Sequence, residues 1–158
     1  MSSYIKKSWR EKLADSKDFP RIQRITEKQS KRWGTGTIVI PAPYEVDEIM
    51  RHVPKGKLIT INEIRERVAR KHGATVGCPI CTGIFAAISS RAAEEDAREG
   101  KKKITPYWRT LKNGGVINEK YPGGAPAQKR LLEQEGHTVV KKGKNYVVVD
   151  YETRLWRA

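Results

Sequence analysis

Two cysteines offer the clearest opportunity for covalent chemistry in this sequence. Cys78 and Cys81 form a Cys-Pro-Ile-Cys pair at the start of a predicted helix, a position at which the pKa of a thiol falls. This spacing is typical of redox dithiols and of half a zinc site. The chain has no second such pair, however, and its three histidines show no metal-ligand spacing. We therefore interpret both cysteines as small packing residues and predict neither a metal site nor a cofactor.

A second candidate is the segment Ile-Thr-Pro-Tyr-Trp-Arg at 104–109. The phenol of Tyr107 is a poor nucleophile, because its ordinary pKa of about 10 keeps it protonated near neutral pH. An aromatic ring does supply the flat wall that an extrahelical nucleobase requires. Tyr107 could form the floor of a base pocket, or it could fill that pocket and close it, and the sequence leaves both alternatives open.

A helix-turn-helix pattern occupies the middle of the chain. Thr60 and Glu63 form a T-x-x-E capping box that begins one helix, and Gly73 ends it. A short turn then delivers Pro79, which starts a second helix over 79–97. Two helices joined in this way are found in many DNA-binding proteins.

The flanking segments predict the rest of the architecture. Residues 37–40 form a short strand or an extended lead-in, and 44–53 form a short helix. A further helix spans 125–135, and a β-hairpin covers 139–151. We therefore expect a mainly α fold with a small β hairpin, that is, a winged helix-turn-helix DNA-binding domain over 37–158.

Charge identifies the class of partner. The 158-residue chain has a formal net charge of +14 and a pI of about 9.9, which favours a polyanion such as nucleic acid. No apolar run approaches the roughly 20 residues that span a bilayer, and no apolar signal segment follows the N-terminus. With so few cysteines, the expected location is the cytoplasm, at the nucleoid.

The first 36 residues are a basic N-terminal extension. Its main bulky apolar groups are Trp9 and Trp33, too little for an independent core. Its lysines include Lys6, Lys7 and Lys17. One interpretation is an arm that follows DNA phosphates. The other is a solvated extension that packs by its two tryptophans.

The order of motifs over roughly 41–158 resembles the DNA-binding domain of the O6-alkylguanine-DNA alkyltransferases, the methylated-DNA–protein-cysteine methyltransferase family. That family has a Pro-Cys-His-Arg motif after the second helix, then a Tyr-Ser-Gly-Gly-type loop and a Leu-Leu-x-x-Glu-Gly helix end. The matching residues here are Pro106, Arg109, Gly123, Gly124, Leu131, Leu132, Glu135 and Gly136. Tyr107 replaces the reactive cysteine, and Trp108 replaces the histidine that activates it. The chain thus resembles the non-catalytic alkyltransferase-like proteins.

The resemblance implies a protein that binds O6-alkylguanine in double-stranded DNA, with its second helix in the minor groove, and marks the lesion for repair proteins. It implies no enzyme activity, and we expect a monomer that does not bind membranes. Two positions depart from the family, because the intercalating arginine falls on Gly83 and the phosphate-rotating tyrosine on Ile61. Gly83 would serve either DNA contact or helix packing. One alternative is a lesion-independent regulator with a blocked pocket, and another is alkyl transfer to Cys78 or Cys81.

These considerations give three groups of predicted site residues. The base pocket is expected to comprise Pro106, Tyr107, Trp108, Lys120, Tyr121, Gly123 and Gly124. The DNA contacts are expected to come from Thr60, Asn62, Arg65, Arg67, Arg70, Lys71, Thr82, Gly83, Arg91, Lys101, Lys102 and Lys103. Arg109 and Glu135 are expected to be structural.

Overall fold

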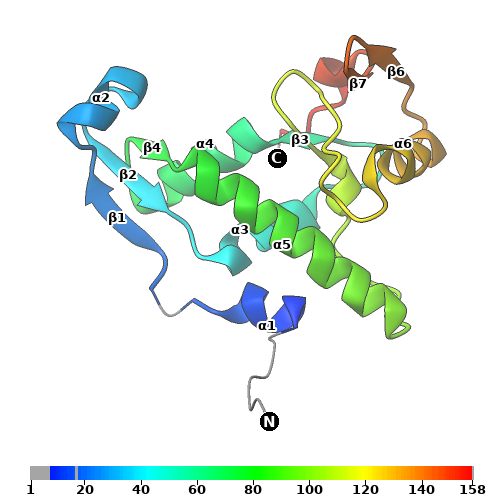
Figure 1. Cartoon of the computed structure of the whole chain (residues 1–158), viewed down its shortest axis with the longest axis horizontal. Helices are drawn as coiled ribbons and strands as arrows, with labels where there is room; N and C mark the ends of the chain where they lie inside the picture. Colours follow the sequence, from blue (N-terminus) through cyan, green and yellow to red (C-terminus); the bar gives the residue numbers. More distant parts are fainter. Residues whose placement is uncertain (1–7, 17, 158) are drawn as a thin grey trace.

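A single long helix, α5 (Pro79–Arg98), runs through the middle of the molecule (Figure 1). The computed structural model describes residues 8–16 and 18–157 of the chain. Helices α3 (Pro43–His52) and α4 (Ile61–His72) pack against one side of α5. The core around these helices includes the fully buried side chains of Val46, Met50, Ile64, Val68 and Ala86. Neither α3 nor α4 covers the opposite side of α5.

The predicted helix-turn-helix is present as α4, a turn and α5. Thr60 begins α4, since its hydroxyl accepts a hydrogen bond from the amide of Glu63 at 3.3 Å. Gly73 ends α4 in the left-handed conformation, with φ of +65°. Only this half of the predicted capping box forms, because the Glu63 carboxylate turns to Arg67, whose Nε lies 3.0 Å away. Arg67 carries a full positive charge, which the backbone amide of the N-cap residue lacks.

A three-stranded sheet lies at one end of the molecule. Its central strand, β2 (Thr37–Ile40), pairs antiparallel with β1 (Arg21–Arg24) and parallel with β4 (Val76–Gly77). Residues 37–40 are therefore a true strand rather than a lead-in. The sequence did not predict β1 or β4, because all four residues of β1 are exposed and β4 has only two residues. Neither strand shows the alternation of apolar and polar residues that marks a half-buried strand.

The N-terminal tract packs onto the rest of the chain at two places. Strand β1 joins the sheet, and helix α1 (Trp9–Ala14) lies against α5 (Figure 1). Between β1 and β2 lies helix α2 (Glu27–Trp33), which begins with a complete capping box at Thr26. The lysines Lys6, Lys7 and Lys17 lie outside the described residues. The domain boundary at residue 36 stays a prediction, although the described part of the tract shares the core of its neighbour.

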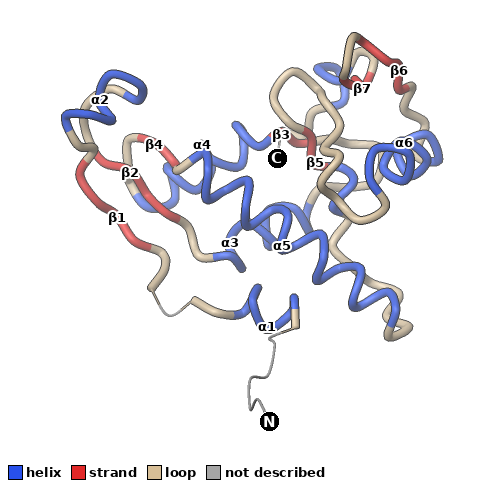
Figure 2. The backbone as a smooth tube through the Cα atoms, in the orientation of Figure 1, coloured by secondary structure: helices blue, strands red, loops and turns tan. Residues whose placement is uncertain are grey.

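The C-terminal part forms a second, smaller core. Its elements in chain order are the 3₁₀ turn η1 (Tyr107–Arg109), β5 (Thr110–Leu111), α6 (Gly124–Gln134), β6 (Val139–Lys142), β7 (Asn145–Val148) and the 3₁₀ turn η2 (Tyr151–Arg154). Strand β5 pairs in parallel with β3 (Ile59–Thr60), and β6 with β7 forms the predicted hairpin. Figure 2 shows this hairpin at the opposite end of the molecule from β1 and β2. The mainly α fold with a small β hairpin is confirmed, and the position of the hairpin is consistent with a wing.

The described part of the chain contains no helix of the length and apolarity that a bilayer crossing would require.

One buried carboxylate joins three segments of this fold. Asp47, on α3, accepts hydrogen bonds from the hydroxyls of Ser89 on α5 at 2.5 Å and Thr105 at 2.7 Å. All three residues are buried. The exposed side chain of Arg51 adds an ion pair at 2.8 Å. Because an unpaired buried polar group is costly, Asp47 fixes the segment before η1 against α5.

Replacing Asp47 by alanine should therefore lower the free energy of unfolding by about 2–4 kcal/mol, since two buried hydroxyls lose their acceptor. Urea unfolding followed by circular dichroism measures the change. The matched control, Arg51→Ala, removes only the exposed partner and should stay within about 0.5 kcal/mol of the unaltered protein. Equal losses in the two variants would contradict this role for Asp47.

Candidate nucleic-acid interface

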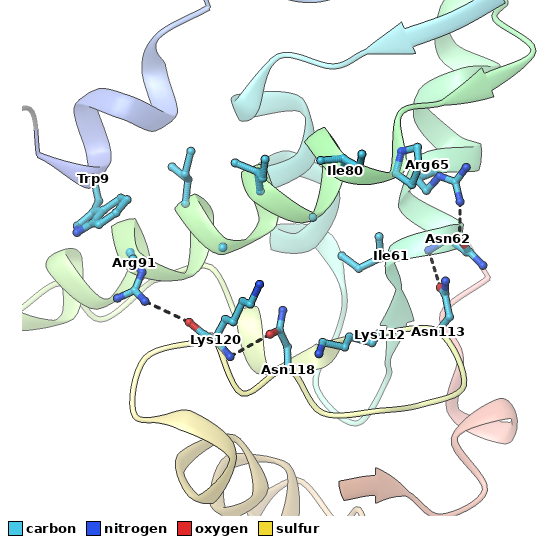
Figure 3. Close-up of a pocket in the computed structure, with 15 residues that line it drawn as sticks. Trp9, Ile61, Asn62, Arg65, Ile80, Arg91, Lys112, Asn113, Asn118 and Lys120 are labelled. Carbon is cyan, nitrogen blue, oxygen red and sulfur yellow. Dashed lines mark hydrogen bonds between the residues drawn. The ribbon is translucent and has the colours of Figure 1, made fainter. Parts of the chain in front are cut away.

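The free side of α5 forms one wall of a groove with a volume of about 720 Å³ (Figure 3). The segment that carries Lys112 and Lys120 lies opposite, and Ile61 of α4 also contributes to the lining. On α5 the groove exposes Ile80 and Ile84, with 60% and 52% of their surface accessible. Large apolar side chains exposed side by side mark a binding surface more often than a free one. The groove is therefore the best candidate site of the described structure.

The helix presents this apolar wall because both of its faces are apolar. Thr82, Phe85, Ala86 and Ser89 point into the protein, while Ile80, Ile84 and Ala87 lie along the groove. Residues three, four and seven apart share one face of a helix. In the sequence, Ile80, Ile84, Ala87 and Ile88 recur at helical spacing, a pattern that normally indicates the core-facing side of a helix. In the structure, the buried side is formed instead by small residues together with Phe85.

Gly83 lies in the middle of this wall. A Cβ built on Gly83 would have no other atom of the described structure within 4 Å, and its φ is not in the left-handed range. Neither helix packing nor backbone conformation therefore requires glycine here, although glycine costs a helix about 1 kcal/mol relative to alanine. Of the two roles predicted for Gly83, close approach by a partner is the one that fits.

Cationic and amide side chains form the rim of the groove (Figure 3). Arg65 is held in place, since its guanidinium donates to the Gly77 carbonyl at 3.0 Å and to Asn62 at 2.8 Å. Arg91 donates to the backbone carbonyl of Lys120 at 3.2 Å, which links α5 to the opposite wall. Among the described residues, neither Arg91 nor Lys120 forms an ion pair. Both charges thus remain available to an anionic partner.

The position predicted for a base pocket is filled by the protein itself. Tyr107 is only 4% exposed, and its ring contacts Trp108 and Tyr121 edge-on, with ring centroids 5.3 and 5.6 Å apart. Burial raises the pKa of the Tyr107 phenol, so the group stays neutral. The structure thus corrects the predicted pocket, because Pro106, Tyr107 and Tyr121 are buried and do not line the groove. Of the predicted pocket residues, Lys120 lies in the groove.

The remaining members of the predicted pocket shape the loop. Trp108 turns its indole Nε1 to the Glu135 carboxylate, 2.9 Å away. Gly123 and Gly124 both have positive φ, +81° and +71°, and a Cβ on Gly123 would lie 2.5 Å from that of Ala127. The turn into α6 therefore accounts for glycine at both motif positions, and no ligand is needed to explain them. Lys120 is therefore the one residue of the predicted base pocket that lines the groove, where it contributes a cation.

Several predicted DNA contacts lie elsewhere. Thr82 cannot be one, because it is fully buried and its hydroxyl donates to the Cys78 carbonyl at 2.6 Å. Thr60 is used as the cap of α4. Arg67, Arg70 and Lys71 lie away from the groove, where they pair with glutamates, at 3.0 and 3.5 Å to Glu63 and at 2.9 Å to Glu45. Lys101 pairs with Asp96 at 3.3 Å, while Lys102 and Lys103 are exposed just after α5.

The structure brings together a smaller set than the sequence predicted. Asn62, Arg65, Gly83, Arg91 and Lys120 all line the groove. Four polar or aromatic lining residues were missed, namely Trp9, Lys112, Asn113 and Asn118. A tryptophan within a basic segment was the one available signal, and it pointed to the extension rather than to the site. The other three lie in a loop whose path depends on tertiary packing.

The two cysteines are poorly suited to accept an alkyl group. Cys78 is buried, and its sulfur accepts a hydrogen bond from the amide of Cys81 at 3.4 Å. Burial, together with a hydrogen bond to Cys78, raises the pKa of Cys81 to about 11. Since the thiolate is the nucleophile, this thiol is almost unreactive near neutral pH. The arrangement supports a packing and capping role.

Glu135 organises the loop that faces α5. Its carboxylate accepts three hydrogen bonds from Arg109, at 2.8, 2.9 and 3.2 Å, and one from Trp108. Arg109 also donates to the Val53 carbonyl at 2.7 Å. Burial alone would raise the pKa of Glu135, but the bonds from Arg109 and Trp108 outweigh it and the pKa is lowered. The pair therefore locks η1 between the ends of α3 and α6.

The lowered pKa predicts how stability depends on pH. The Glu135 contribution is complete above the unfolded-state pKa of about 4.3 and is lost as the pH falls through the lower folded-state value. At neutral pH, Glu135→Gln should cost about 3 kcal/mol, because Arg109 is left buried without its counter-ion. Thermal melts over pH 7 to about 3 should show this difference narrowing in acid. The exposed neighbour variant Glu133→Gln should follow the unaltered protein throughout, and a pH-independent deficit in Glu135→Gln would disprove the linkage.

Comparison with known proteins places the fold. No protein-family model matches the chain, and no curated protein matches it. Among solved structures it is similar to S. pombe Atl1 in complex with damaged DNA containing O6-carboxymethylguanine, at 19% identity and a TM-score of 0.53. It is similar to S. pombe ATL in complex with DNA at 20% identity and the same TM-score. Each match covers 73% of this chain and 94% of the other. The chain therefore shares the fold of these alkyltransferase-like proteins.

Proposed function

We propose that this chain is a non-catalytic DNA-binding protein that recognises alkylation-damaged duplex DNA through the α5 groove. The observation that carries the proposal is the groove itself, whose apolar wall lies on the second helix of a helix-turn-helix and whose cationic rim comes from both sides of the groove. The two similar proteins from S. pombe were each solved in complex with DNA, one of them damaged at O6 of guanine. Protein–DNA recognition needs the same two components, phosphate contacts and a surface for bases.

The charge of the chain supports DNA as the ligand. A net charge of +14 attracts a polyanion from a distance and releases its counterions on contact. Arg91 and Lys120 form no ion pair with a described residue, and both lie on the rim. A phosphodiester strand along the groove would therefore meet cations on both walls while its bases face the isoleucines.

The groove also suits a base that has left the duplex. Flipped bases are held by stacking and by contacts to their polar edges in a compact apolar pocket. Here Ile61 and the isoleucines of the α5 wall, Ile80 and Ile84, supply the apolar surface. The amide side chains of Asn113 and Asn118 lie on the opposite wall. Since Tyr107 is buried and does not line the groove, we place the extrahelical base in the groove itself.

Two side chains support the proposal that the protein is not catalytic. The Tyr107 phenol has its pKa raised by burial, and Cys81, the more accessible cysteine, has a pKa of about 11. Neither group supplies the anion that displacement at an alkyl carbon requires. We accordingly propose that repair proteins act on the lesion after this protein marks it, in the cytoplasm at the nucleoid.

A second candidate function is lesion-independent DNA binding. The filled position at Tyr107 favours it, and so does the absence of a wedge at Gly83, because flipping costs a few kcal/mol that a wedge helps to offset. In this case the α5 groove would contact the backbone and edges of intact duplex DNA.

Competition binding distinguishes the two functions. With fluorescence anisotropy at a single salt concentration, we expect a duplex containing O6-methylguanine to compete about 10-fold better than the matched intact duplex, a difference of about 1.4 kcal/mol. Holding the salt constant is essential, because phosphate contacts make every affinity salt-dependent. Equal affinities would reject lesion recognition and leave lesion-independent binding.

Intact-mass measurement of the same mixtures is the control for the non-catalytic part. The mass of the protein should be unchanged after incubation with methylated DNA. A gain of one methyl group would show transfer, and mapping it to Cys78 or Cys81 would replace the present proposal with an alkyltransferase.

Gly83 provides a test in which stability and binding change in opposite directions. Gly83→Ala should stabilise the protein by about 0.5–1 kcal/mol through helix propensity. Gly83→Leu should fold as well but weaken DNA binding on the order of 10-fold, about 1.4 kcal/mol, because its side chain enters the groove. Thermal melting and anisotropy measure the two effects. Unchanged DNA affinity in Gly83→Leu would show that DNA does not enter the groove at this point.

A further inference from the structure

Helix α1 covers the acidic end of α5. The Glu95 carboxylate accepts hydrogen bonds from the amides of Trp9, at 2.8 Å, and Arg10, at 3.2 Å. The Arg10 guanidinium pairs with Asp96 and, at 2.6 Å, with Glu99. Two carboxylates of α5 and that of Glu99, the residue after its end, therefore hold one end of α1 in a fixed position.

This cover changes the charge that a ligand of the groove would meet. Exposed carboxylates on the last turns of α5 would repel the phosphates of a strand lying along the helix. Arg10 pairs with two of them, and Lys101 pairs with Asp96 as well. The docked helix α1 thus offsets part of the negative charge at the C-terminal end of α5.

Docking also brings Trp9 to the end of the groove. Trp9 lines the groove and remains partly exposed. Lys12 Nζ lies 4.1 Å from the centre of its ring, and the guanidinium carbon of Arg91 lies 5.4 Å from it. Figure 3 shows Trp9 beside Arg91, which extends toward Lys120 on the other wall. A rigid indole is therefore placed beside two cations at the edge of an apolar wall.

We propose that Trp9 stacks on an unpaired nucleobase of a DNA strand bound in the α5 groove. This inference rests on the proposed function. The chemistry favours a base, because a flat aromatic ring beside cations matches a flat π surface flanked by phosphates, and stacking of this kind tolerates any base. It favours an unpaired base, because the faces of paired bases are covered by their neighbours in the duplex. The N-terminal tract would then belong to the site rather than act as an independent arm.

The test compares two duplexes, one fully paired and one with a single bulged adenine, by fluorescence anisotropy at one salt concentration. Trp9→Ala should bind the bulged duplex about 5- to 100-fold more weakly, the range expected for losing one base–aromatic stack. Its affinity for the paired duplex should change less than about 2-fold, within the range of a minor surface change. Trp9→Phe should recover most of the loss, because it keeps an aromatic face.

Trp33→Ala is the matched control, since Trp33 belongs to the same tract but does not line the groove. It should bind both duplexes as the unaltered protein does, and thermal melting of every variant checks the fold. Unchanged binding of the bulged duplex by Trp9→Ala would overturn the proposal, and so would an equal loss on both duplexes. If the unaltered protein binds neither duplex, the proposed function itself fails, which is a distinct result.

Discussion

The interaction on which the site depends is the buried contact between Glu135 and Arg109. It joins the end of α6, the turn η1 and the carbonyl of Val53 at the end of α3. Because η1 leads through β5 into the loop that carries Lys112 and Lys120, this contact fixes the wall opposite α5. A buried ion pair of this kind adds little stability by itself, but it defines where the chain must go. The groove is a consequence of that constraint.

The helix α5 shows how one element can serve both the core and a ligand. Its buried side uses small residues such as Ala86 and Ser89, which allow α3 to approach closely. Its larger isoleucines, Ile80 and Ile84, are therefore free to form the groove. Glycine at position 83 lowers the helix propensity of this segment and opens space in the wall. Such a local cost is reasonable where a partner, rather than the protein, occupies the space.

Burial also decides what the side chain at position 107 can do, where the resemblance implied a reactive cysteine in related proteins. In place of a thiolate the chain has Tyr107, enclosed by Trp108 and Tyr121. A neutral, buried phenol packs against its neighbours and does not act as a nucleophile. The same fold, shared with proteins solved on DNA, thus carries its proposed binding surface on α5, the 112–120 loop and Trp9.

The sequence alone indicated helices α3 to α6, the hairpin and the structural roles of Arg109 and Glu135, but it did not predict helices α1 and α2. Periodicity and caps located α3 to α6, since these signals are local, and the motif order indicated the fold shared with alkyltransferase-like proteins. It also supplied Arg65, Gly83, Arg91 and Lys120 as candidates. Tertiary structure decided the rest. That Tyr107 is enclosed, that Thr82 faces inward and that Trp9 reaches the groove all depend on contacts between residues far apart in the chain. Such contacts leave no periodic signal, because they arise only when separate elements pack.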